Sequence, residues 1–142
     1  MTQGITMTTI LADDYRNDFK EAMNPKRMTL NPAPLALKLI EEAIEAALAA
    51  GIKLEQVEAA CQIFVGREKL RLDPTKDGIF NYKAARDELA DCDIVHRTMR
   101  GLLGISDGLL GESVIEKRLV NRNRLWRVNE FGTLSNMGLK DG

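Results

Sequence analysis

Glu88 places a carboxylate in the middle of an apolar helical face, and any fold of this chain has to accommodate it. The residues from about Tyr82 to Leu103 repeat with the period of an α-helix. The apolar arc of this segment contains Ala84, Ala85, Cys92, Val95, Met99 and Leu103. A carboxylate that faces the inside of a helical bundle must be neutralised, because removing an unpaired charge from water is costly. We therefore expect a cation opposite Glu88.

The rest of the chain also has helical patterning. Its 142 residues fit one domain, and a 44% apolar content supplies a core. Aromatic residues make up only 5% and Leu and Ala dominate, which favours helices over a sandwich or barrel. Together these features predict an all-α fold, a bundle of four to five helices. The expected helices are Asp13–Met23, Pro34–Ala50, Leu54–Lys69, Tyr82–Leu103 and a last one from Ser106 or Asp107 to about Trp126.

The sequence predicts a single domain over residues 1–142, with an irregular arm at 1–11 and a flexible tail at 129–142. No signal peptide is visible, and the longest apolar stretches are too short to span a membrane. Cys61 and Cys92 are isolated and lie in apolar stretches, so we expect buried, reduced thiols in a cytoplasmic protein. The formal net charge of -1 shows that the chain as a whole is not a polyanion binder, and it argues neither for nor against a local basic patch. We expect no nucleic-acid partner and no membrane partner.

Two acidic pairs have the same helical spacing. Glu42 and Glu45 are three residues apart, as are Glu88 and Asp91, so each pair lies on one helical face. If the two helices pack together, the four carboxylates form a hard oxygen site suited to Mg²⁺ or Mn²⁺. Glu41 precedes the first pair and is expected to act as a further ligand or to orient a water molecule.

Ordinary structural roles are the alternative for both pairs. Lys38, Glu41, Glu42 and Glu45 also follow the spacing of a solvated helix face. Glu88 could instead form a buried salt bridge, for example to Lys117 or Arg124 on the last helix.

A basic strip lies on the last predicted helix. Lys117, Asn121 and Arg124 follow the spacing i, i+4, i+7, and an ammonium, an amide and a guanidinium in line can hold phosphate oxygens. The alternative is a solvated basic face, because Arg118 and Arg122 lie nearby. A metal cluster beside the strip favours the first interpretation, since metal ions and basic side chains commonly clamp polyphosphates together.

Three segments in this order resemble the MazG-like all-α nucleotide pyrophosphohydrolases. They are Leu39–Glu45 (LIEEAIE), Asp87–Asp91 (DELAD) and Glu116–Arg124 (EKRLVNRNR). The family's signature is EExxE on one helix, ExxD on another and a K…N..R segment on a later one. The resemblance covers roughly residues 35–126. The segment from Ala46 to Asp87 is longer than is usual in the family.

The resemblance implies a site and a reaction. Glu42, Glu45, Glu88 and Asp91 would be Mg²⁺ ligands, with Mn²⁺ as a substitute, and Glu41 would assist catalysis. Phosphates would be bound by Lys117, Asn121 and Arg124. The reaction would convert a nucleoside triphosphate, (d)NTP, to the monophosphate and pyrophosphate. Members of the family assemble as homodimers or homotetramers, and small copies are common in bacteria and in phage-infected cells.

The base and the class of activity stay open at this point. The resemblance favours purine deoxynucleotides such as dGTP or dATP. One alternative is a house-cleaning enzyme of the same superfamily that acts on dUTP or dCTP. The other is a non-enzymatic helical regulator that oligomerises through its Leu- and Ala-rich faces.

Overall fold

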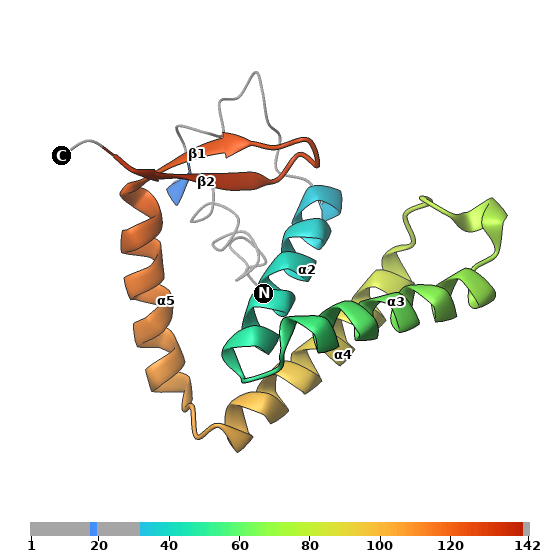
Figure 1. Ribbon diagram of the computed structural model, residues 1–142, viewed down its shortest axis with the longest axis horizontal. Helices are drawn as coiled ribbons and strands as arrows, with labels where there is room; N and C mark the ends of the chain where they lie inside the picture. Colours follow the sequence, from blue (N-terminus) through green and yellow to red (C-terminus); the bar gives the residue numbers. More distant parts are fainter. Residues whose placement is uncertain (1–17, 20–31, 141–142) are drawn as a thin grey trace, which may run out of the picture. The chain divides into compact units, whose positions relative to one another are not determined.

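The computed structural model describes residues 18–19 and 32–140, and this part of the chain is mostly helical (Figure 1). A short 3₁₀ helix, η1 (Pro74–Lys76), lies in the loop between α3 and α4. The remaining elements are α2 (Pro32–Ala49), α3 (Leu54–Arg71), α4 (Tyr82–Leu102), α5 (Asp107–Arg122), β1 (Arg124–Val128) and β2 (Leu134–Leu139).

Four of the predicted helices are confirmed with small changes at their ends. Local capping explains where they begin. The side-chain oxygen of Asn81 accepts a hydrogen bond from the backbone N–H of Ala84 at the start of α4. Ser106 does the same for Leu109 at the start of α5. The predicted helix at 13–23 and the predicted arm at 1–11 lie outside the described residues, apart from Asp18 and Phe19.

The C-terminal region corrects the predicted boundary of the last helix. α5 ends at Arg122 rather than near Trp126, and the chain continues into an antiparallel hairpin of β1 and β2. The sequence from Arg124 to Val128, RLWRV, contains Trp126 and Val128, and both residue types are enriched in strands. The predicted tail at 129–142 therefore contains a turn and the strand β2.

Asn129 organises the turn of the hairpin. Its side-chain oxygen accepts hydrogen bonds from the backbone N–H groups of Phe131 and Thr133, each at 3.0 Å. Its amide nitrogen donates to the hydroxyls of Thr133 and Ser135. Gly132 has a φ of 76°, a conformation that favours glycine, and a β-carbon there would lie 3.4 Å from Pro34 Cγ. The turn is thus held against the start of α2.

A bulge near the end of β2 sets the register of the hairpin. Trp126 pairs with Asn136, whereas Arg124 pairs with Leu139, so β2 contains one extra residue in this stretch. Gly138 lies within the bulge and has a φ of 103°, which few other residues adopt.

Contacts within the chain divide it into two compact units. Of the described residues, the first unit contains those up to Ala50 and those from Ser113 onward, and the second runs from Gly51 to Glu112. The first unit therefore holds α2, most of α5 and the hairpin. The second holds α3, η1 and α4.

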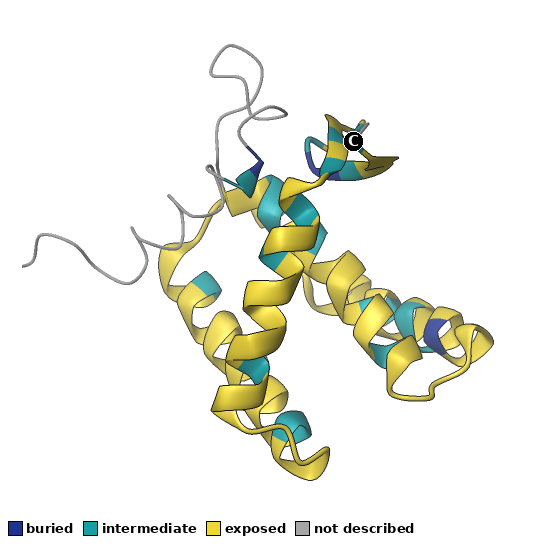
Figure 2. Cartoon of the chain, turned by 90° about the vertical axis from the view of Figure 1, so that its left-hand side faces the viewer, coloured by how far each residue is buried: buried dark blue, intermediate teal, exposed yellow. Residues whose placement is uncertain are grey.

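Most described residues of the helices are exposed in the isolated chain, as the colouring of Figure 2 shows, and many of them are large and apolar. In the described part of the chain, the buried residues are Phe19, Val57, Thr133 and Leu134. No described residue of α2 or α4 is buried. The expectation that Glu88 faces a buried arc is wrong for the single chain, because Glu88 is exposed and Val95 on the same arc is 67% exposed.

The two cysteines also differ from expectation. Both are free, but Cys61 is half-buried and Cys92 is exposed. Within the described residues, none of the helices combines the length and apolar character that crossing a membrane requires.

Candidate functional site

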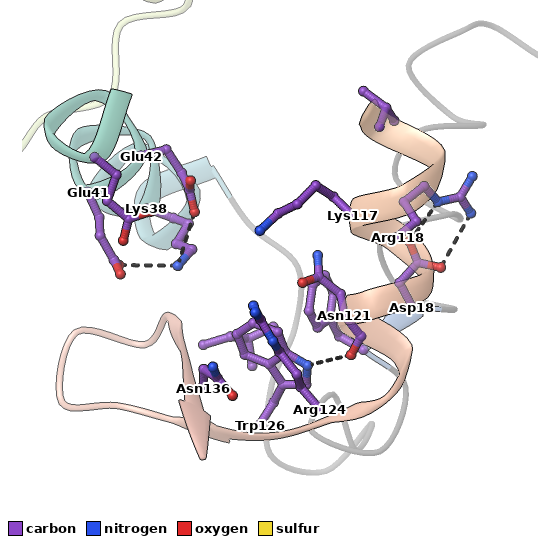
Figure 3. A pocket seen from close by; sticks show the side chains of 14 residues that line it. Asp18, Lys38, Glu41, Glu42, Lys117, Arg118, Asn121, Arg124, Trp126 and Asn136 are labelled. Carbon is purple, nitrogen blue, oxygen red and sulfur yellow. Dashed lines mark hydrogen bonds and ion pairs between the residues drawn. The ribbon is translucent and has the colours of Figure 1, made fainter. Parts of the chain in front are cut away.

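A cavity of about 480 Å³ lies within the first unit, between α2, α5 and the hairpin (Figure 3). This volume is in the usual range of small-molecule sites, roughly 300–1,000 Å³. Its lining changes from acidic on α2 to basic on α5 and to aromatic and amide groups on the hairpin. Fourteen residues line it: Asp18, Phe19, Lys38, Glu41, Glu42, Glu45, Val114, Lys117, Arg118, Asn121, Arg124, Trp126, Leu134 and Asn136.

The acidic wall comes from one face of α2. Helical spacing places Lys38, Glu41, Glu42 and Glu45 along the same side of this helix. Lys38 Nζ lies 3.2 Å from Glu41 Oε2 and 3.3 Å from Glu42 Oε1. Burial lowers the pKa of Lys38, but the hydrogen bonds and charges of Glu41 and Glu42 outweigh it, so the pKa lies above its ordinary value. These carboxylates thus hold a cation supplied by their own helix.

The basic wall comes from α5 and the start of β1. Lys117 and Asn121 are one helical turn apart on α5 and both line the cavity. Figure 3 shows the Lys117 side chain reaching from α5 toward the side of the cavity formed by α2. Arg124 also lines the cavity, although it begins β1 rather than continuing the helix. The predicted phosphate-binding residues are therefore brought together from a helix and a strand.

Asp18 holds two arginines of α5, of which Arg118 also lines the cavity. Its carboxylate accepts hydrogen bonds from Nε of Arg118 and from Nε of Arg122, each at 2.7 Å. The Asp18 side chain is only 5% exposed. Burial raises its pKa, but the bonds and charges of Arg118 and Arg122 prevail and hold the pKa below its ordinary value. Asp18 is thereby linked to α5.

Six of the eight predicted site residues line the cavity, and the other two belong to the second unit. The six that line the cavity are Glu41, Glu42, Glu45, Lys117, Asn121 and Arg124. Glu88 and Asp91 belong to α4 in the second unit, and both are exposed. Their part in a shared metal site stays a prediction.

The cavity's carboxylates fit a hard divalent cation in chemical type. Among the described residues, no three carboxylate, thiol or imidazole side chains are grouped so as to hold a metal ion by themselves. Mg²⁺ does not require such a cage, because it is commonly bound by one or two carboxylates together with waters and substrate phosphates. The ammonium of Lys38 between Glu41 and Glu42 shows that a positive charge is accommodated there.

Sequence reasoning missed the aromatic end of the cavity. The sequence predicts Trp126 at the end of the last helix, whereas as a strand residue it lines the cavity together with Leu134 and Asn136. The strand-favouring residues Trp126 and Val128 and the turn residues Asn129 and Gly132 were the local signals for this hairpin. The roles of Asp18 and Phe19 had no local signal, because their partners lie about a hundred residues away.

Comparison with protein-family models, with curated proteins and with solved structures finds no match to this chain.

Proposed function

We propose that this protein is a metal-dependent pyrophosphohydrolase of the MazG-like type that converts a (d)NTP to the monophosphate and pyrophosphate. One observation carries the proposal. The carboxylates of Glu41, Glu42 and Glu45 line the same cavity as Lys117 and the other two residues predicted to bind phosphate. An acidic wall facing a basic wall suits a polyphosphate that arrives with a divalent cation.

Each wall has a distinct role in this proposal. Lys117, Asn121 and Arg124 hold phosphate oxygens and thereby fix the chain of phosphates in the cavity. Glu42 and Glu45 would hold Mg²⁺ or Mn²⁺, which when bound polarises phosphoryl oxygens and makes water more acidic. Water adds to the α-phosphorus, the bond to the bridging oxygen breaks, and pyrophosphate leaves with that oxygen.

Glu41 is suited to receive the proton of the attacking water. It lies next to the proposed ligand Glu42 and lines the same cavity. In the isolated chain its carboxylate is paired with Lys38 at 3.2 Å. Lys38 therefore has to release Glu41 when the cation and substrate bind.

A substrate panel tests the activity. The purified protein is incubated with each canonical dNTP and NTP and with dUTP, in Mg²⁺ or Mn²⁺, and the products are separated by chromatography. We expect equal amounts of monophosphate and pyrophosphate from at least one nucleotide, with purine deoxynucleotides such as dGTP or dATP favoured. Glu42→Gln should abolish turnover, whereas Glu116→Gln, an exposed change on α5 outside the cavity lining, should not. If no nucleotide yields a monophosphate at high protein concentration, the proposal is refuted.

Glu88→Gln tests whether the second acidic pair belongs to the metal site. If Glu88 and Asp91 are ligands, this variant loses metal binding, measured by calorimetry without nucleotide, yet keeps the wild-type melting temperature. Loss of stability with unchanged metal affinity would assign Glu88 to a structural ion pair instead. That outcome, together with an inactive wild-type protein, would favour a non-enzymatic helical regulator.

We further propose that the protein is a homodimer or homotetramer. Ile63 and Phe64 on α3 are 55% and 57% exposed, and Ile94 and Val95 on α4 are 61% and 67% exposed. Soluble monomers rarely expose many large apolar side chains of this kind. We therefore propose that a second copy of the chain buries them. Sedimentation velocity over a range of concentrations tests this, and a monomer at all of them would contradict it.

A further inference from the structure

One face of the hairpin forms the apolar end of the cavity. Trp126 and Asn136 are directly opposite each other in the strand pairing, so their side chains project from the same face. Leu134 lies two residues before Asn136 and shares that face. All three line the cavity whose other walls carry the proposed phosphate-binding and metal-binding groups. In Figure 3, Trp126 and Asn136 lie beside Arg124 at this end.

Trp126 is held as a rigid, half-buried aromatic surface. Its indole Nε1–H donates to the backbone carbonyl of Asn121 at 2.8 Å. The ring of Phe19 meets it edge-to-face, with ring centres 4.9 Å apart and an angle of 85° between the planes. The single polar group of the indole is therefore already used, and what Trp126 offers a ligand is its ring surface. Aromatic surfaces of this kind stack on nucleobases with little regard to their identity.

Asn136 adds a group that can distinguish one base from another. Its Oδ1 accepts the backbone N–H of Gly138 at 2.9 Å, a bond made within the bulge of β2. One lone pair of the amide oxygen is thus used by the chain itself, and this bond fixes the orientation of the amide. The exposed side chain also carries an NH₂ group, which only donates. A donor pairs with a carbonyl oxygen on a base edge and not with an exocyclic amine.

We propose that this end of the cavity is a nucleobase subsite, in which the base stacks on Trp126 and a ring carbonyl accepts a hydrogen bond from Asn136. The subsite therefore favours bases with a carbonyl at this edge over bases with an amine there. This inference rests on the proposed function, because the same cavity must hold the phosphates.

The only tryptophan of the chain gives a direct binding signal. The Glu42→Gln variant is titrated with inorganic tripolyphosphate, dITP and dATP, and Trp126 fluorescence is recorded. Both nucleotides should quench the fluorescence, whereas tripolyphosphate should compete with them without comparable quenching. The two nucleotides share a purine ring, but dITP carries a carbonyl where dATP carries an amine. We expect dITP to bind about fivefold more tightly, which is the effect of one hydrogen bond.

Asn136→Asp, in the same Glu42→Gln background, is the matched variant. An aspartate keeps the shape and can still accept the Gly138 N–H, but its second oxygen replaces the donor with an acceptor. The preference for dITP should disappear or reverse toward dATP. The affinity for tripolyphosphate, measured by competition with either nucleotide, should change little. Trp126→Leu has no tryptophan signal, so its binding is measured by calorimetry. It should lose the nucleotide advantage over tripolyphosphate, with circular dichroism confirming that the variant is folded.

The failures of the two proposals are distinguishable. Tight nucleotide binding without quenching, or a dITP-to-dATP ratio that Asn136→Asp leaves unchanged, would overturn the base subsite and leave the proposed activity standing. Binding of neither the nucleotides nor tripolyphosphate, by the Glu42→Gln variant and by the wild-type protein alike, would overturn the proposed function and the subsite with it.

Discussion

Replacing Asp18 by Asn should destabilise the first unit by removing one charge that two arginines share. The carboxylate is 5% exposed and accepts from Arg118 at 2.7 and 3.3 Å and from Arg122 at 2.7 Å. A hydrogen bond to a charged group contributes about 1.5–3 kcal/mol. The arginine side chains are 33% and 48% exposed, so water screens part of each interaction. For the whole set we expect a loss of about 2 kcal/mol.

The loss should depend on pH in a definite direction. The folded-state pKa of Asp18 lies below its ordinary value of 3.8. The stabilisation is therefore complete above that ordinary value and disappears as the pH falls through the lower folded-state value. Asp18→Asn and the wild type should differ fully near neutral pH and progressively less at increasingly acidic pH.

Urea denaturation followed by Trp126 fluorescence measures this, because Trp126 belongs to the same unit as Asp18. Glu116→Gln removes an equal charge from an exposed position on α5 and should change the free energy of unfolding by less than about 0.5 kcal/mol. The reasoning is refuted if Asp18→Asn is as stable as Glu116→Gln, or if its deficit is the same in acid as at neutral pH.

Three further changes have defined outcomes. Asn129→Ala removes the side chain that organises the hairpin turn, so urea denaturation should show a loss of about 1–2 kcal/mol, and an unchanged midpoint would contradict this role. Ser106→Ala removes the cap of α5 and should cost about 1 kcal/mol by the same measurement, with wild-type stability as the refuting result. Lys38→Met frees Glu41 and Glu42 from their internal cation, so calorimetry should show Mg²⁺ binding about fivefold tighter, and weaker binding would show that Lys38 does not compete with the metal.

Several parts of the fold could be predicted because they depend on neighbouring residues. Helical periodicity and caps such as Asn81 act within one or two turns, and they located α2, α3 and α4 almost to their ends. The same local spacing put Glu42 and Glu45 on one face and Lys117 and Asn121 on another. The sequence thus determined which side chains could share a wall of the site.

The shared cavity and its aromatic end were decided by contacts between residues far apart in the chain. Arg124 and Trp126 were assigned to a helix, and only pairing with β2 makes them strand residues whose side chains line the cavity. Asp18 meets Arg118 across most of the chain's length, which no local pattern reveals.

Burial was the least predictable property. The apolar arc around Glu88 was correctly identified as part of a helix, but a pattern does not say what covers it, and in the isolated chain Glu88 is exposed. The sequence by itself determined the helices and the chemical character of their faces, because both follow from spacing along one element. Only the tertiary structure decided which faces meet, because that depends on pairing and packing between distant segments.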